Sequence, residues 1–252
     1  MFAKRRAVPL LFLALGGVLG ATAFAGRSRG EKPAVAPASV PTPVVVELFS
    51  SEGCSSCPPA DVLLQKLDGA GTVGGARVLA LEFHVDYWND LGWKDPFSRA
   101  DWSERQQNYA RMRIGGTYTP EMIVDGRDAF VGSDSSRARD ALARAASRPH
   151  AHLQVSRVGS EIHIRVPKLD GAPATAWFAV AERGHRTEVP RGENAGTTLV
   201  HGPVVTSLTR LAGDPAAGFE SVVPLKNVGD RFLYVAFVQR DDTREIIGSA
   251  AL

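Results

Sequence analysis

The fold of this chain is decided by one stretch at residues 44–67, VVVELFSSEGCSSCPPADVLLQKL. Its opening run is apolar and β-branched, which is typical of a buried strand. The Pro58-Pro59 pair then begins a helix, because the missing amide of proline costs nothing in the first turn. Leucines at helical spacing continue that helix. The pattern therefore places Cys54 and Cys57 between a buried strand and the amino terminus of a helix.

A Cys-x-x-Cys pair in this position is suited to thiol–disulfide exchange. The amides and the macrodipole at the start of a helix favour a thiolate, and the short spacing lets the two sulfurs meet. Cys54 can then act as the nucleophile, and Cys57 can resolve the mixed disulfide that forms. Two other interpretations stay open. A structural disulfide closes too small a loop to gain much entropy, and half of a metal site needs further ligands.

The rest of residues 44–150 continues the same α/β pattern. Strands are predicted at 78–85, 120–124 and 129–131, and helices at 99–113 and 134–147. The order is β-α-β-α-β-β-α, so the first two strands should be parallel with a right-handed crossover. Asp125-Gly126 is a hairpin turn signal, which makes the last two strands antiparallel.

Residues 151–252 change in character and predict an all-β, sandwich-like C-terminal domain. Short strands separated by turn signals, without a convincing amphipathic helix, are typical of this architecture. The predicted strands are 153–157, 161–166, 175–182, 197–200, 219–223, 232–239 and 245–250.

The first 43 residues predict an export signal and a tether. Residues 1–25 combine a basic start, an apolar stretch and a small-x-small cleavage site, as a secretory signal does. An uncleaved membrane anchor is the alternative. Residues 26–43 form a Pro-rich linker. We therefore expect the protein in an oxidising space, either a bacterial periplasm or the exterior.

Composition excludes several classes of protein. The chain has 252 residues, 44% of them hydrophobic and 22% charged, which indicates a globular protein. Its 29 basic and 27 acidic residues create no field for nucleic acid. Beyond residue 25 no apolar run is long enough to span a membrane. With only two cysteines, a four-cysteine zinc site is excluded.

The domain order and a second motif resemble the thioredoxin-like superfamily. Thr119-Pro120 opens the third strand, where thioredoxin-like proteins place a cis-proline beside the redox pair. The resemblance implies that Pro120 is cis and shapes a substrate groove. It also implies that the backbone of Thr119 pairs with the substrate.

Longer motifs resemble one secreted thioredoxin-like family, known mainly as domain of unknown function 1223. They are VELFSSEGCSSCPPAD at residues 46–61, FHVDYW at 83–88 and LGWKDPF at 91–97. Weaker similarity continues through RGEN at 191–194 and His201. Because the activity of that family is undefined, the resemblance implies a fold and a compartment rather than a reaction.

His84 and Glu47 are candidate proton carriers for the cysteines. Strand alternation puts Glu82, His84 and Asp86 on one face at the carboxyl end of a parallel strand, where sites gather. His84 with Asp86 can shuttle protons to the cysteines or join them around a metal; the alternative is a structural histidine that fixes the following loop. Ordinary thioredoxins carry an acid six residues before the first cysteine. Here Leu48 occupies that position, with Glu47 beside it on the opposite face.

Three functions follow as hypotheses. The first is a secreted thiol–disulfide oxidoreductase that acts on protein substrates with a redox partner protein and needs no cofactor. The second is a copper or other soft-metal binding protein that uses Cys54, Cys57 and His84 as ligands. The third is a redox-inert binding module. The aromatic loop that holds Trp88, Trp93 and Phe97 either lines a substrate groove or packs on itself.

Overall fold

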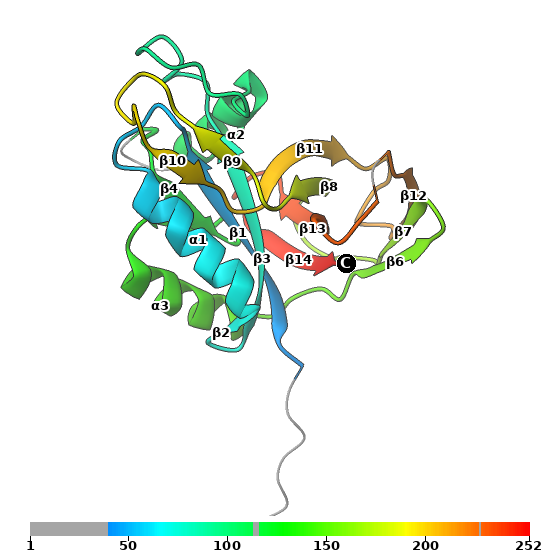
Figure 1. The fold of residues 1–252 in the computed structure, drawn as a ribbon. Helices are drawn as coiled ribbons and strands as arrows, with labels where there is room; N and C mark the ends of the chain where they lie inside the picture. Colours follow the sequence, from blue (N-terminus) through cyan, green and yellow to red (C-terminus); the bar gives the residue numbers. More distant parts are fainter. Residues whose placement is uncertain (1–39, 113–115, 227) are drawn as a thin grey trace, which may run out of the picture. The chain divides into compact units, whose positions relative to one another are not determined.

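The structure is a computed structural model that describes residues 40–112, 116–226 and 228–252 (Figure 1). The predicted signal at 1–25 and most of the predicted linker at 26–43 lie outside these residues. The chain from Val40 to Leu252 forms one compact unit. Among the described residues, no helix has both the length and the apolar character needed to cross a membrane.

The fold is mixed α/β, with three helices and fourteen strands among the described residues. In chain order the elements are β1 (Thr42–Ser50), α1 (Pro58–Ala70), β2 (Thr72–Val73), β3 (Ala76–His84), α2 (Ala100–Ala110), β4 (Glu121–Val124), β5 (Asp128–Val131), α3 (Ser135–Ala146), β6 (Gln154–Val158), β7 (Glu161–Val166), β8 (Ala174–Glu182), β9 (Arg186–Glu188), β10 (Thr198–Val200), β11 (Val204–Arg210), β12 (Phe219–Pro224), β13 (Phe232–Arg240) and β14 (Ile246–Ala251).

One large mixed sheet organises the molecule. Its strand order is β14-β13-β8-β11-β3-β1-β4-β5, and β2 pairs with β3 off this path. β1 and β3 are parallel, with Ser50 opposite His84, whereas β4 and β5 are antiparallel. Both pairings confirm the predictions from the βαβ order and from the Asp-Gly turn.

Helices cover both faces of this sheet. On one face, Leu48 of β1 packs against Ala60 and Leu64 of α1 in a cluster that also includes α3. On the other face, Phe49 packs in a second cluster with Trp102 and other residues of α2. Successive residues of β1 therefore enter opposite cores, because side chains alternate along a strand.

The C-terminal half extends the large sheet and adds a second layer. β8, β11, β13 and β14 continue the sheet beyond β3, while β6, β7 and β12 form a separate three-stranded sheet. Ile162 and Ile164 of β7 pack against Phe178 of β8 and Ala236 of β13. The sandwich-like packing expected after residue 151 thus shares one of its two sheets with the N-terminal half.

β11 joins the two halves, and the sequence did not predict it. It runs parallel to β3 at the single pair Val204–Glu82 and antiparallel to β8 along its length, with an irregularity between Val205 and Ser207. The backbone N–H of Glu82 donates to the carbonyl of Pro203 at 2.8 Å. This pairing brings the segment before β11 to the carboxyl end of β3.

Candidate functional site

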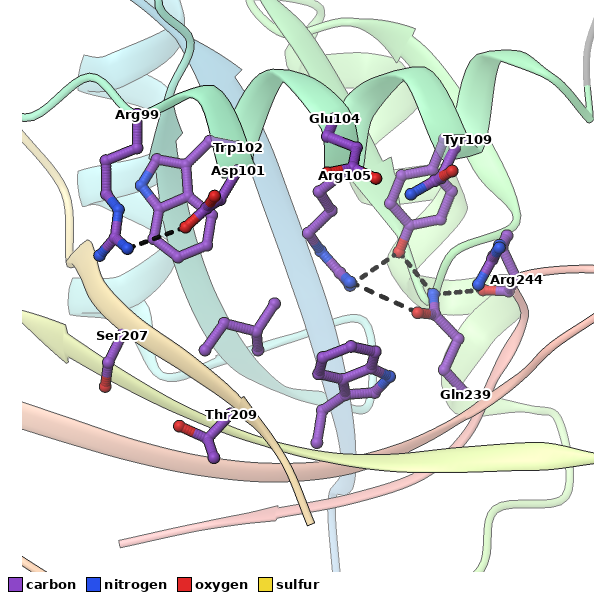
Figure 2. A pocket seen from close by; sticks show the side chains of 13 residues that line it. Arg99, Asp101, Trp102, Glu104, Arg105, Tyr109, Ser207, Thr209, Gln239 and Arg244 are labelled. Atoms are coloured by element: carbon purple, nitrogen blue, oxygen red, sulfur yellow. Dashed lines mark hydrogen bonds and ion pairs between the residues drawn. The ribbon is translucent and has the colours of Figure 1, made fainter.

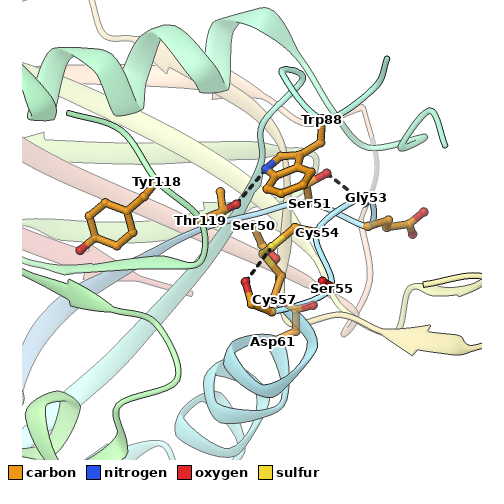
Figure 3. The surroundings of a disulfide bond; sticks show 12 residues. Ser50, Ser51, Gly53, Cys54, Ser55, Cys57, Asp61, Trp88, Tyr118 and Thr119 are labelled. Atoms are coloured by element: carbon orange, nitrogen blue, oxygen red, sulfur yellow. Dashed lines mark hydrogen bonds between the residues drawn. A yellow bond between two sulfur atoms is a disulfide. The ribbon is translucent and has the colours of Figure 1, made fainter. Parts of the chain in front are cut away.

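Cys54 and Cys57 form a disulfide where β1 gives way to α1, as the sequence pattern predicts (Figure 3). Their sulfurs are 2.25 Å apart, and Cys57 is the N-cap residue of α1. Both cysteines are fully buried, with 0% of each side chain exposed, although Ser55 and Ser56 between them are exposed. The two sulfurs are therefore bonded to each other and closed to solvent in this structure.

Few donors surround the sulfur of Cys54. Pro58 and Pro59 have no N–H, so the first turn of α1 offers fewer amides than a typical helix start. The N–H of Cys57 is occupied by the carbonyl of Cys54 at 3.2 Å. The hydroxyl of Ser56 lies 3.3 Å from Cys54 Sγ and is the polar group in hydrogen-bond contact with that sulfur.

Trp88 of the aromatic loop and Thr119 of the cis-proline segment lie on the side of the disulfide away from α1 (Figure 3). The Thr119–Pro120 peptide bond is cis, as the resemblance implies. Trp88 Nε1 donates to Thr119 Oγ1 at 2.9 Å, which joins the aromatic loop to the cis-proline segment. A Cβ on Gly53 would lie 3.1 Å from Trp88 Cβ, so the residue before Cys54 has little room for a side chain.

The C-terminal half also holds the cysteine motif, through the loop between β9 and β10. Asn194 Nδ2 donates to the carbonyls of Glu52 at 2.8 Å and Cys54 at 3.0 Å. The carboxylate of Glu193 accepts from Ser55 N–H at 3.1 Å. The RGEN motif was the signal for these contacts, but no pattern in the sequence indicated that its partner is the cysteine motif.

Asp61 is a buried acid that was not predicted as a site residue from the sequence. It lies one helical turn after Cys57 in α1, and Ser50 Oγ donates to its Oδ1 at 2.6 Å. Burial and, after it, the charge of Glu82 raise the pKa of Asp61 to about 8. An aspartate on the apolar face of a predicted helix was the available signal. Asp61 is therefore a buried acid with a raised pKa in the first turns of α1.

A second buried cluster gathers at the carboxyl end of β3. His84 Nδ1 lies 2.6 Å from Asp95 Oδ2, and its Nε2 lies 3.0 Å from Glu82 Oε1. His201 Nε2 lies 2.9 Å from Glu52 Oε1. His201 Nδ1 is 3.3 Å from Glu82 Oε1 without making a hydrogen bond. The alternation of β3 revealed Glu82 and His84, but not the partners from other loops.

The carboxylates in this cluster offset the effect of burial on the histidines. Burial lowers the pKa of His84, but the charges of Asp95 and Glu82 outweigh it and hold that pKa well above its usual range. Burial likewise opposes protonation of His201, whereas Glu52 and Glu82 raise its pKa to about 9. The cluster is therefore strongly held together by charge.

Asp86 does not form the predicted proton shuttle with His84, and the aromatic loop contacts the buried cluster. Asp86 Oδ1 accepts from Ser103 Oγ of α2 at 2.5 Å rather than reaching His84. Trp93 Nε1 donates to Glu52 Oε2 at 2.8 Å, and the ring of Phe97 packs on the ring of His84, 5.4 Å between centroids. The loop thus packs on the site as well as on itself.

Glu47 is not part of the cysteine site. Arg105 Nε donates to Glu47 Oε1 at 2.6 Å, and Tyr109 donates to Oε2. Both partners belong to α2, on the face of the sheet opposite to α1. The proposed role of Glu47 as a proton carrier for the cysteines needs correction, because strand alternation points its carboxylate into the other core.

A cavity of about 470 Å³ lies beside this ion pair, between α2 and the strands β8 and β11 (Figure 2). Arg105, Tyr109 and Gln239 form its polar wall, where Gln239 Nε2 donates to Tyr109 Oη at 2.7 Å. Neither cysteine lines this cavity. It is therefore separate from the disulfide.

The ligand set expected for a soft metal is not assembled in this state. The two sulfurs are bonded to each other. Among the described residues, the group whose ligand atoms lie within 4.8 Å of one another consists of Glu82, His84 and His201. His84 thus has carboxylate and imidazole neighbours, not thiolates.

The comparisons with known proteins identify a family but no activity. The model of the family described as "Protein of unknown function (DUF1223)" matches residues 45–239, so the chain belongs to this family. No curated protein matches the chain.

Two solved structures are similar to different degrees. A crystal structure of a protein from Agrobacterium tumefaciens is 28% identical, with a TM-score of 0.65, over 83% of this chain and 93% of that one. The chicken interferon gamma receptor alpha chain is 12% identical over 54% of this chain and 58% of that one, and its TM-score of 0.25 carries no argument about the fold.

Proposed function

We propose that this member of the family is a thiol–disulfide oxidoreductase whose Cys54–Cys57 pair cycles between disulfide and dithiol. The observation that carries the proposal is the closed Cys-x-x-Cys disulfide at the start of α1, with Thr119 of the cis Thr119–Pro120 peptide in its surroundings (Figure 3). The expected substrates are protein thiols and disulfides, and a redox partner protein returns the pair to its starting state. The expected location is the periplasm or the exterior.

The exchange uses two substrate thiols. A substrate thiolate attacks Cys54 Sγ, forms a mixed disulfide and releases Cys57 as a thiolate, which takes up a proton. A second substrate thiolate then attacks the substrate sulfur of the mixed disulfide and releases Cys54. The substrate has lost two electrons to form a disulfide, and the pair has gained them. The reverse sequence reduces a substrate disulfide.

Proton transfer at Cys57 is assigned to Asp61. Its carboxyl group lies one helical turn away, and its pKa of about 8 is close to that of a thiol. A group with matched pKa can both accept and return a proton near neutral pH. Ser50, which donates to Asp61 Oδ1, fixes the orientation of that carboxyl group.

Access to the sulfurs requires movement of the groups that cover them, because both cysteines are fully buried. Trp88 is the main candidate, since it lies over the segment before Cys54 and is tied to Thr119 by a single hydrogen bond. The complete burial also favours the competing hypothesis of a redox-inert module with a structural disulfide. The experiment must therefore separate the two.

The test is trapping in cells that export the protein. Cys57→Ser should accumulate mixed disulfides through Cys54, seen as bands on non-reducing gels that disappear with reductant. Cys54→Ser is the matched control and should accumulate fewer. A native disulfide that resists excess dithiothreitol, together with no trapped species in Cys57→Ser, would instead establish the structural role.

A further inference from the structure

We propose that Glu82, His84 and His201 bind one divalent transition-metal ion, for which Zn²⁺ is the best fit. The cysteine sulfurs are not ligands of this site, so the proposal does not require the disulfide to be redox-active. Glu82 and His84 come from the carboxyl end of β3, and His201 comes from the segment before β11. All three are buried, with exposed fractions of 0%, 0% and 3%.

The ligand atoms are arranged around one point. Glu82 Oε1 lies 3.0 Å from His84 Nε2 and 3.3 Å from His201 Nδ1. The three atoms lie within 4.8 Å of one another. Ligand atoms around a tetrahedral Zn²⁺ with bonds of about 2.0–2.2 Å are about 3.4 Å apart. Small side-chain shifts therefore suffice to admit an ion.

The second nitrogen of each imidazole is held by a carboxylate. Asp95 holds His84 Nδ1 at 2.6 Å, and Glu52 holds His201 Nε2 at 2.9 Å. Carboxylate–histidine pairs of this kind fix the tautomer and aim the other nitrogen at a metal. Glu82 Oε2 is fixed in the same way by the N–H of Gly202, which leaves Oε1 facing the imidazoles.

One ligand atom has no hydrogen bond in the described structure. His201 Nδ1 is buried and lies beside Glu82 Oε1 without making a hydrogen bond. A buried polar atom that makes no hydrogen bond is costly even when a charged partner such as Glu82 lies nearby, so this geometry points to a group that completes the contact. A metal ion between His201 Nδ1 and Glu82 Oε1 would complete it.

Charge also favours a cation here. Glu52, Glu82 and Asp95 bring three buried carboxylates together, and among the described contacts their partners are imidazoles, backbone N–H groups and the Trp93 indole. A divalent ion offsets this charge without protons on the imidazoles. Two imidazoles and one carboxylate suit Zn²⁺ better than Ca²⁺ or Mg²⁺, which prefer oxygen ligands.

The experiment measures Zn²⁺ binding to the chelator-treated protein by competition with a chromophoric chelator. We expect one Zn²⁺ per chain. Glu82→Gln and His201→Ala should each weaken binding roughly 100-fold, and Asp95→Asn roughly 10- to 100-fold, as loss of an outer carboxylate does elsewhere. His163→Ala, in the separate three-stranded sheet, is the matched control and should bind as the wild type does.

Two further measurements distinguish loss of the metal site from misfolding and from metal binding by the cysteines. Zn²⁺ should raise the thermal midpoint of the wild type but not that of folded His201→Ala, with folding checked by circular dichroism. The double variant Cys54→Ser, Cys57→Ser should still bind one ion. The proposal is overturned if the wild type binds no Zn²⁺, if the ligand variants bind it undiminished, or if binding disappears with the cysteines.

Discussion

The side-chain amide of Asn194 donates to the backbone carbonyl of Cys54 at 3.0 Å, and this contact spans 140 residues of sequence. The same amide also donates to the carbonyl of Glu52. The backbone around the disulfide is thus held by a loop from the C-terminal half. The second half of the chain is therefore part of the cysteine site, not only a neighbouring layer.

Asn194→Ala should destabilise the fold and loosen the cysteine motif. Two buried carbonyls lose their donor, so the free energy of unfolding should fall by about 1–3 kcal/mol. Urea unfolding monitored by circular dichroism checks this. Glu193→Ala, which removes an exposed contact of the same loop with Ser55, should have a much smaller effect. Equal effects from both variants would contradict the role given to Asn194.

Asp61→Asn should flatten the dependence of stability on pH. The pKa of Asp61 is about 8 in the fold and near 3.8 when unfolded, so between these values the folded state holds one more proton. The contribution of Asp61 to wild-type stability must therefore fall as pH rises from about 4 to 8, by up to about 1.4 kcal/mol per pH unit. Asparagine removes that contribution and keeps an acceptor for Ser50.

The comparison isolates Asp61 from its titrating neighbours. His84 and His201, whose pKa values are raised, stabilise the fold below pH 6.5, and this stabilisation is lost as pH rises toward their folded pKa. Glu82, the other charge near Asp61, has its pKa lowered to about 2 and stays ionised. These groups are present in both proteins. The free energy of unfolding should be measured for both proteins at pH 5 and pH 8. The advantage of the variant over the wild type should be larger at pH 8.

Trp88→Ala should speed reduction of the disulfide. The substitution removes the indole ring, which lies on the side of Cys54 away from α1 (Figure 3), and its hydrogen bond to Thr119 is lost. A barrier lowered by about 1.4 kcal/mol corresponds to a roughly tenfold higher rate. Alkylation of released thiols after addition of dithiothreitol measures it. Leu91→Ala, in the same loop but 59% exposed, is the control and should reduce at the wild-type rate.

Glu47→Gln should affect stability without changing the redox equilibrium. The change leaves the guanidinium of Arg105 buried without its carboxylate, which costs about 3–5 kcal/mol in comparable pairs. Equilibration of the folded variant with glutathione buffers should give the wild-type ratio of disulfide to dithiol. A shifted ratio would restore Glu47 to the cysteine site. Exchanging Arg105 as well, for Gln, should recover part of the stability.

Local sequence signals predicted the N-terminal half well. The run before the cysteines became β1, the proline pair began α1, and the Asp125-Gly126 turn joined β4 to β5. These signals act over a few residues, so each could be read without knowledge of the fold. The cis peptide before Pro120 followed from resemblance, because X-Pro bonds are rarely cis on base rate alone.

Contacts between residues far apart in the sequence could not be predicted from such local signals. β11 was missed because Thr206, Ser207 and Thr209 interrupt its apolar pattern, and only its place between β3 and β8 makes it a strand. His201 and Asn194 precede β11 in the chain, and they reach their partners because β11 pairs with β3. The sequence therefore revealed half of each site: the cysteines without Asn194, and the polar end of β3 without His201.

Glu52 links the metal-ligand cluster to the disulfide, and this link predicts coupling between them. Its carboxylate holds His201, while its backbone lies two residues before Cys54 and donates to Asp95 at 2.8 Å. Opening the disulfide frees this segment and orients Glu52 less well. We expect Zn²⁺ to bind a few-fold more weakly to Cys54→Ser, Cys57→Ser, whose hydroxyls cannot close the loop.

Thermodynamic linkage makes the effect reciprocal. If the closed disulfide strengthens Zn²⁺ binding by some factor, saturating Zn²⁺ must shift the equilibrium toward the disulfide by the same factor. Glutathione titrations with and without Zn²⁺ measure the second quantity. Glu52→Gln should weaken Zn²⁺ binding and reduce both shifts together, because it removes the carboxylate that connects the sites. Shifts that persist unchanged in Glu52→Gln would place the coupling elsewhere in the fold.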